Sequence, residues 1–326
     1  MAKRNNSQKV LLETERLASF PKLNPNPVLE VDTSGKVIFC NAATIQTLKK
    51  LKLKEDPRLF LPADLKKILK ELREKKETRF RREVGLGNSL FEENIRFAPE
   101  FKTAHIYTYE ITERKQAAEN IKKLLDETIE ALSKLSKIRD PYTAGHENRV
   151  AALATAIARK MGLSENRVEG IRIASLLHDV GKITIPAEIL SKPTSLSEFE
   201  FSIVKQHSLA SSEILENIDF PWEVAKTTLQ HHERINSSGY PQGLSGNKII
   251  LEAKILAVAD VVEAMSSHRP YRSALGTGKA LEEISKNRGI LYEPEVVDAC
   301  LNVFEKGFKF EPGPAGPEEG ELPTNQ

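Results

Sequence analysis

Hydrophobic and polar residues alternate along much of the first third of the chain, as they do in β-strands that bury one face. The runs VLEVD and KVIFCN flank Thr33-Ser34-Gly35, which predicts a hairpin. Residues 43–76 change to the spacing of short helices, interrupted at Asp56-Pro57 and Leu61-Pro62. Residues 78–111 return to alternation in the runs RFRREV, SLFEENIRFA and HIYTYEIT. Strands, short helices and strands again predict a small α+β domain.

The rest of the chain follows the periodicity of α-helices. Residues 113–137 are continuously helical in pattern, and four apolar residues are spaced four, seven and three apart along them: Ile121, Leu125, Leu132 and Leu135. This spacing approximates the a/d seam of a parallel coiled coil, but a single amphipathic helix packed on its own domain would also show it. Residues 140–307 are predominantly helical in pattern. The tail EPGPAGPEEGELPTNQ has the Pro/Gly/Glu-rich composition of a disordered segment.

Composition then limits the kind of protein. A chain of 326 residues has room for about two domains, and its 40% hydrophobic and 29% charged residues are typical of a soluble globular protein. The net charge of +2 is too small to indicate a nucleic-acid polymer as partner. Cys40 and Cys300 lie too far apart to suggest a disulfide framework. No signal peptide and no apolar run of about 20 residues is found, so we expect a cytoplasmic protein without a membrane span.

Five of the seven histidines fall between residues 146 and 232, and their surroundings are informative. His178 and Asp179 end the apolar helical run RVEGIRIASLLHD, whose spacing turns the pair towards the interior. A buried imidazole beside a carboxylate is costly unless a cation or hydrogen bonds offset the cost. For an isolated pair, hydrogen bonds within the core would be the ordinary explanation.

The pair is not isolated, because further histidines and an aspartate occupy similar positions. His146 lies at the polar start of a long helical run, His207 lies in FSIVKQHSLASSEIL, and His231 and His232 close the helical run WEVAKTTLQHH. Asp260 interrupts the apolar run AKILAVADVVEAM, where a serine or arginine partner could also satisfy it. Imidazoles and carboxylates suit iron, manganese and zinc, and the absence of cysteine argues against a structural zinc site. Seven such residues exceed what one ion needs and fit two ions bridged by a carboxylate, which together activate water for phosphoester cleavage.

Four motifs in order then identify a family resemblance: DPYTAGHENRVA, LLHDVGKITIPAEIL, HHERINSSGYPQGLSG and ILAVADVVEAMSSHRPYR. Residues from about 127 to 307 resemble an HD-GYP domain, a bacterial subfamily of the HD metal-dependent phosphohydrolases. The resemblance implies an all-α fold and hydrolysis of cyclic di-GMP to pGpG or GMP. It also implies two divalent ions, iron or manganese, held by seven residues with Asp179 as the bridge: His146, His178, Asp179, His207, His231, His232 and Asp260.

Further residues fit roles in substrate binding and catalysis beside Asp179. Lys182 follows His178 at i+4 and can reach the same phosphate, although a solvated lysine at a helix end would look alike. By resemblance Arg269 and Arg272 contact the other phosphate, with a surface ion pair as the alternative. Tyr240 could stack on a guanine or position its loop. The resemblance also implies contact of the GYP loop with diguanylate cyclase (GGDEF) domains.

Two positions depart from the family pattern. Some relatives have a glutamate ligand for a third metal where this chain has Tyr142, so we expect two ions. Ile235-Asn236-Ser237 stands where the family tends towards Trp-Asp-Gly, so the loop loses an aromatic ring, a charge and the backbone freedom of a glycine. His268 matches no ligand position and is interpreted as a surface residue.

The N-terminal domain resembles a PAS domain in PNPVLEVDTSGKVIFCNAA and in YEITERKQAAENI, which is similar to the exit by which PAS domains connect to an output module. We expect no chromophore, because His105 lies on a predicted strand and Cys40 lies outside a flavin-adduct motif. A small-molecule or dimerisation role is expected instead. The predicted fold is multidomain: a segment 1–12, an α+β PAS-like domain 13–112, a helical linker 113–137 that favours a homodimer, an all-α HD-GYP domain 138–307 and a disordered tail 308–326.

The sequence therefore predicts a sensor-regulated cyclic di-GMP phosphodiesterase. Two alternatives stay open: a module that binds the nucleotide with little turnover, which the altered Ile235-Asn236-Ser237 loop favours, and a phosphohydrolase for another cyclic dinucleotide.

Overall fold

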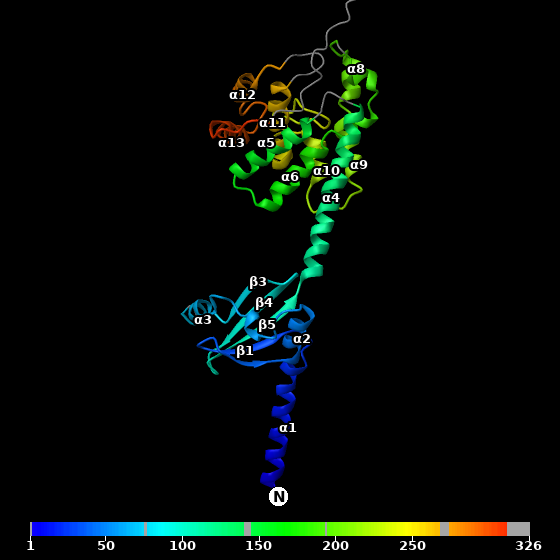
Figure 1. The fold of residues 1–326 in the computed structure, drawn as a ribbon. Helices are drawn as coiled ribbons and strands as arrows, with labels where there is room; N and C mark the ends of the chain where they lie inside the picture. The colour runs from blue at the N-terminus through cyan, green and yellow to red at the C-terminus, as the bar shows by residue number, and fades with distance from the viewer. Residues whose placement is uncertain (1, 75–76, 140–144, 193, 268–273, 312–326) are drawn as a thin grey trace, which may run out of the picture. The chain divides into compact units, whose positions relative to one another are not determined.

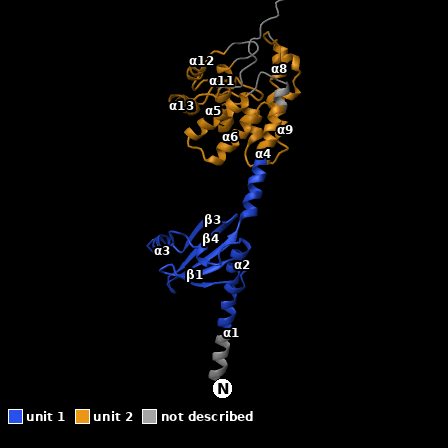
Figure 2. Cartoon of the chain, viewed as in Figure 1, with its two compact units in different colours: residues 1–123 blue, residues 124–326 orange. Residues whose placement is uncertain are grey.

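The chain divides into two compact units, residues 1–123 and residues 124–326 (Figures 1 and 2). The computed structural model describes residues 2–74, 77–139, 145–192, 194–267 and 274–311, without the side chains of 2–11 and 135–139. Over these ranges, no helix combines the length and the apolar composition that crossing a membrane requires.

The first unit contains one antiparallel sheet of five strands in the order β2-β1-β5-β4-β3. Its elements are α1 (Ala2–Leu23), β1 (Val28–Asp32), β2 (Val37–Cys40), α2 (Ala42–Lys50), the 3-10 helix η1 (Pro57–Phe60), α3 (Leu65–Glu74), β3 (Arg79–Leu86), β4 (Ser89–Ala98) and β5 (Thr103–Glu110). The predicted hairpin is confirmed as β1 and β2, and the alternating runs at 78–111 are confirmed as β3, β4 and β5.

The alternation along the strands builds the core of this unit. On β4, Phe91, Ile95 and Phe97 point to one face of the sheet and are buried. α3 covers a part of the same cluster with Leu65, Ile68, Leu69 and Leu72, which recur at helical spacing. The helix α1 was not predicted, and it crosses the expected boundary between residues 12 and 13. Its large apolar side chains, such as Leu17 and Phe20, are exposed, so no buried stripe marks this helix in the sequence.

The helix α4 (Thr112–Arg139) contains the predicted linker. Leu125 and Leu132 pack with Ile129 into a cluster of the second unit, whereas Ile121 is 69% exposed. Leu135 lies outside the described side chains. Two of the four seam positions are therefore used within the chain, as expected for an amphipathic helix that packs on its own domain.

Helices are the regular elements of the second unit in its described residues. Its elements are α5 (His146–Lys160), α6 (Glu165–Leu177), η3 (Val180–Thr184), α7 (Ala187–Leu190), α8 (Glu198–Val204), α9 (His207–Leu215), α10 (Val224–Gln230), η4 (Gly246–Lys248), α11 (Leu251–Ser266), α12 (Thr277–Lys286) and α13 (Pro294–Glu305). α11 runs through the core, and its residues Ile255, Leu256, Val258 and Val262 are fully buried. A helix with so few exposed residues is apolar nearly all round, which explains the run in which Asp260 is embedded.

A tight turn joins α6 to η3 and places the end of α6 against the start of α9. Ser211 on α9 donates a hydrogen bond to the carbonyl of His178 at 2.7 Å and accepts one from the amide of Gly181 at 2.8 Å. A Cβ on Gly181 would lie 2.2 Å from the His207 carbonyl oxygen and 2.4 Å from the Ser211 amide nitrogen. Only glycine therefore allows the two segments to approach so closely.

We expect Gly181→Ala to lower the free energy of unfolding by about 1–3 kcal/mol or more, because the new methyl group meets backbone atoms that cannot rotate away. Urea-induced unfolding measures this change. Gly278→Ala on α12, where nothing lies within 4 Å of the new Cβ, is the matched control. We expect it to change stability by less than about 1 kcal/mol. Equal stability of the two variants would contradict the close approach at Gly181.

Candidate metal centre

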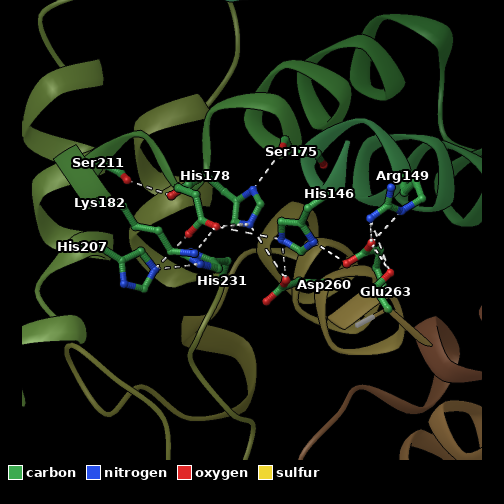
Figure 3. A network of polar contacts seen from close by, with 12 residues as sticks. His146, Arg149, Ser175, His178, Lys182, His207, Ser211, His231, Asp260 and Glu263 are labelled. Carbon is green, nitrogen blue, oxygen red and sulfur yellow. Dashed lines mark hydrogen bonds and ion pairs between the residues drawn. The ribbon is translucent and has the colours of Figure 1, made fainter. Parts of the chain in front are cut away.

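Three helices bring one group of ligand atoms together. His146 begins α5, His178 caps the C-terminal end of α6, and Asp260 lies in the middle of α11 (Figure 3). The Nε2 atoms of His146 and His178 lie 3.3 and 3.9 Å from Asp260 Oδ1. All three side chains are buried, and their ligand atoms lie close enough together to hold one metal ion.

A second group consists of histidines only. His207 is the first residue of α9, while His231 and His232 follow the last residue of α10. The Nε2 atoms of His207 and His231 are 3.4 Å apart, and the three imidazoles together could hold a second ion. The stretch FSIVKQHSLASSEIL, in which the sequence analysis located His207, is divided between α8 and α9, and His207 stands at the start of the second helix.

Asp179 lies between the two groups. Its Oδ2 is 3.5 Å from His178 Nε2 and 3.9 Å from His146 Nε2, whereas its Oδ1 is 3.4 Å from His207 Nε2. The two oxygens of one buried carboxylate therefore face two different sets of ligands. This is the geometry that a bridging carboxylate needs.

Lys182 also reaches this carboxylate, but by a different route from the predicted one. The expectation of a helical i+4 relation to His178 is wrong in its local structure, because α6 ends at Leu177 and Lys182 lies on the 3-10 helix η3. The ammonium group of Lys182 lies 2.7 Å from Asp179 Oδ2. Its side chain is only 12% exposed, so it is not a solvated lysine at a helix end.

Backbone acceptors orient three of the histidines. The Nδ1 atoms of His178, His207 and His231 lie 2.8, 2.7 and 2.6 Å from the carbonyl oxygens of Ser175, Val204 and Thr228, each three residues earlier in the chain. An Nδ1–H that donates to a carbonyl leaves Nε2 as the ring nitrogen with a free lone pair. The three Nε2 atoms are those that face the shared space.

His146 is oriented by a carboxylate that the sequence analysis missed. Its Nδ1 contacts Glu263 Oε2, and Glu263 in turn accepts hydrogen bonds from Arg149 Nε and Ser267 Oγ, both at 2.7 Å (Figure 3). Glu263 is fully buried on α11. Its position three residues after Asp260, in the same apolar run, was the available signal, because i and i+3 share a helix face.

Charge compensation at Asp179 and burial of the histidines favour the protonation states that bind a metal. Burial alone would raise the pKa of Asp179, but Lys182 and the histidines, His178 foremost, hold it well below its usual range. Burial, with His178 and His207 nearby, lowers the pKa of His231 to about 3. Burial likewise lowers the pKa values of His207 and His232. Ionised carboxylates and neutral imidazoles are the forms that bind divalent metals.

The loop after His232 is held by another buried carboxylate, Glu233. Its two oxygens accept hydrogen bonds from the amides of Gln242 and Leu244, at 2.7 and 2.8 Å. A Cβ on Gly239 would lie 2.4 Å from Glu233 Cα, so the loop folds back onto its own start. The Tyr240 ring is thereby placed against His232, with 4.7 Å between the ring centroids and 31° between their planes.

The departure at Ile235-Asn236-Ser237 has a visible backbone consequence. Ser237 adopts a φ of +68°, in the left-handed region where glycine is favoured. Asn236 Oδ1 accepts hydrogen bonds from the amide and hydroxyl of Ser238, at 3.1 and 2.7 Å, which supports the turn. The serine therefore keeps the conformation that a glycine would adopt without strain.

Several residues named in the sequence analysis lie outside the described residues or in the first unit. Arg269, Arg272, His268 and Tyr142 lie outside the described residues, as do residues 312–326 of the predicted disordered tail. His105 lies on β5 of the first unit, as predicted, with its Nε2 3.5 Å from Glu30 Oε1.

The fold and the site together define a helical domain with a buried His/Asp centre. The family profile described as HD domain matches residues 130–296. The chain therefore belongs to the HD domain family.

Curated relatives are similar to about half of the chain. A "Cyclic di-GMP phosphodiesterase" of Thermotoga maritima is 44% identical over 181 residues, which cover 55% of this chain and 49% of the relative. The "Cyclic di-GMP phosphodiesterase response regulator RpfG" of Xanthomonas campestris is 42% identical over 54% of this chain and 47% of its own length. A "3'3'-cGAMP-specific phosphodiesterase 3" of Vibrio cholerae is 35% identical over 56% of this chain and 39% of its own length. The chain thus spans about half the length of these relatives or less.

We expect Ser237→Gly to raise the free energy of unfolding by about 0.5–1 kcal/mol, because relief of the left-handed strain exceeds the entropy that glycine adds to the unfolded chain. Ser238→Gly, at a neighbouring residue without a positive φ, is the control and should destabilise. Urea-induced unfolding compares both with the parent protein. A loss of stability in Ser237→Gly would refute this account of the loop.

Proposed function

We propose that this chain is a metal-dependent phosphodiesterase that hydrolyses cyclic di-GMP to pGpG or GMP. The observation that carries the proposal is the position of Asp179, whose two oxygens face two separate groups of ligand atoms. A buried site with seven nitrogen and carboxylate ligands exceeds the needs of one ion. The names of the relatives in Thermotoga maritima and Xanthomonas campestris support cyclic di-GMP as the substrate.

The residues fit two divalent ions. His146, His178 and Asp260 would hold one ion, and His207, His231 and His232 would hold the other, with Asp179 between them. We favour iron or manganese, because imidazoles mixed with carboxylates and no thiolate suit these metals. When bound, such a pair supplies Lewis acidity towards the phosphate and acidifies a water molecule.

The chain's own residues then bind and orient the substrate. Lys182 places a cation 2.7 Å from Asp179, within reach of a phosphate bound at the centre, where it can stabilise the leaving oxygen. Tyr240, stacked beside His232, offers an aromatic surface next to the second group of ligands. By resemblance, Arg269 and Arg272 would bind the second phosphate.

A second candidate substrate is 3'3'-cGAMP. The relative in Vibrio cholerae is named for this nucleotide, and both compounds contain two phosphodiesters and at least one guanine. The same metal centre would serve either substrate, so the choice would depend on contacts with the bases.

For the remainder of the chain we propose a PAS-like sensor at residues 13–112 that regulates the HD-GYP domain at 138–307 through the helical segment 113–137. The five-stranded antiparallel sheet with flanking helices supports the sensor. Exposed Ile121 and Leu124 on α4 support a homodimer through this segment. The GYP loop is the proposed contact for GGDEF domains. The free thiols of Cys40 and Cys300 support a reducing cytoplasm.

The decisive experiment combines metal analysis with product analysis. Protein purified without oxygen should contain about two iron or manganese ions per chain and convert cyclic di-GMP to pGpG in chromatographic assays. Removal of the metal with a chelator should abolish turnover, and manganese should restore it. The parallel assay with 3'3'-cGAMP decides between the two substrates. Tight binding of cyclic di-GMP without product would contradict the proposed activity.

Asp179→Ala should lose bound metal and reduce turnover to background, because both ligand groups lose their shared carboxylate. The matched control is Asp298→Ala, which removes only the surface partner of Arg288 and should retain both properties. Metal content and product formation are measured for each variant. Retention of turnover in Asp179→Ala would refute the site assignment.

Glu263→Gln should weaken metal binding by roughly 10- to 100-fold, because the neutral amide orients His146 less strongly and reduces its basicity. Glu252→Gln on the same helix removes only a surface pair with Arg167 and serves as the control. Competition with a chromophoric chelator measures the affinity. Unchanged affinity in Glu263→Gln would show that His146 needs no such support.

A further inference from the structure

A row of aromatic rings leads away from the second histidine group. His231 and His232 have ring centroids 3.9 Å apart, and the Tyr240 ring follows His232 at 4.7 Å. Phe201 of α8 then meets Tyr240 edge to face at 6.5 Å. The row thus begins at a candidate metal ligand and ends at a phenylalanine whose surface is 45% exposed.

A lysine stands over the outer end of this row. Lys205 Nζ lies 4.7 Å from the centroid of Phe201 and 5.6 Å from that of Tyr240. No carboxylate among the described residues forms an ion pair with this ammonium group. Lys205 caps the C-terminal end of α8, two residues before His207, so the backbone holds its charge close to the metal-ligand histidines.

Packing alone does not account for this arrangement. Phe201 belongs to none of the buried apolar clusters that the described residues form. Lys205 places a cation beside the rings of Phe201 and Tyr240. Nucleotide bases of every kind stack on aromatic side chains. A lysine has a flexible side chain and binds a phosphate as a point charge. A cyclic dinucleotide has two bases and two phosphates, so a centre that cleaves one phosphodiester leaves the other half to be bound.

We propose that Phe201 and Lys205 belong, with Tyr240, to the subsite for the uncleaved half of a cyclic dinucleotide: a purine stacks on Phe201, and Lys205 supplies an additional cation to the second phosphate. The inference rests on the proposed function and adds two residues to its substrate site. α8 thereby becomes a substrate-binding element, because it contributes Phe201 and its C-cap Lys205 lies two residues before His207.

Substitutions at Phe201 can distinguish the stacking of a base from ordinary apolar packing. Phe201→Leu keeps an apolar side chain but loses the flat face, and it should raise the KM for cyclic di-GMP by about 5- to 150-fold. Phe201→Trp keeps a flat face and should stay near the parent value. Lys205→Met should raise KM roughly tenfold, and Lys205→Arg should restore most of the loss. Phe199→Ala, at a neighbouring 75% exposed phenylalanine, and Lys160→Ala, at the end of α5, are the controls and should change nothing.

A comparison of two substrates shows whether the loss of activity depends on the uncleaved half of the nucleotide. Bis(p-nitrophenyl) phosphate has one phosphodiester and no purine, so its kcat/KM should fall clearly less than that for cyclic di-GMP in Phe201→Leu and Lys205→Met. Parallel losses on both substrates, or full activity of Phe201→Leu on cyclic di-GMP, would overturn the subsite.

A direct measurement of binding makes the test independent of turnover. The phosphorothioate analogue of cyclic di-GMP is titrated calorimetrically into the metal-loaded protein, and Phe201→Leu and Lys205→Met should raise its Kd by the same factors as KM. If the parent protein binds the analogue but cleaves no cyclic dinucleotide, the proposed activity fails, and weaker binding by the two variants still supports the subsite. Unchanged Kd in both variants would refute it.

Discussion

The position of the Asp179 carboxylate is the constraint on which the second unit depends. A buried anion is tolerated only where positive charge or metal compensates it, and here the ammonium group of Lys182 lies 2.7 Å from the carboxylate. The fold supplies this environment by ending α6 at Leu177, directly before His178, and by fixing the following turn to α9 through Ser211. The turn, the glycine within it and the start of α9 therefore form one structural unit.

The site is supported by a second layer that acts through hydrogen bonds. Carbonyl oxygens three residues earlier orient His178, His207 and His231, so the helix ends themselves direct the ligand atoms inwards. Glu263 and Glu233 have the corresponding roles for His146 and for the loop that ends in Tyr240. Each of these buried carboxylates is satisfied by several donors, which offsets the cost of its burial.

The sequence predicted the strands and the candidate metal ligands better than it predicted where individual helices begin and end. Strand alternation located β1 to β5, and the histidine contexts located five residues that now lie together. Periodicity could not show that α6 stops before Lys182 or that His207 starts a new helix, because 3-10 and α segments share short-range spacing. The contact of Glu263 with His146 could not be predicted, because a single acidic residue in an apolar run does not indicate which residue it will contact.

The packing of α4 has a consequence for how the metal centre can respond to the rest of the chain. Leu125, Ile129 and Leu132 share one cluster with Leu177 and Val180, the residues directly before and after His178-Asp179. Close-packed interiors do not deform continuously, so a change in the register of α4 must be accommodated by the neighbours of these two ligands. The two residues that flank His178-Asp179 therefore pack in one cluster with a helix that contributes none of the candidate ligands.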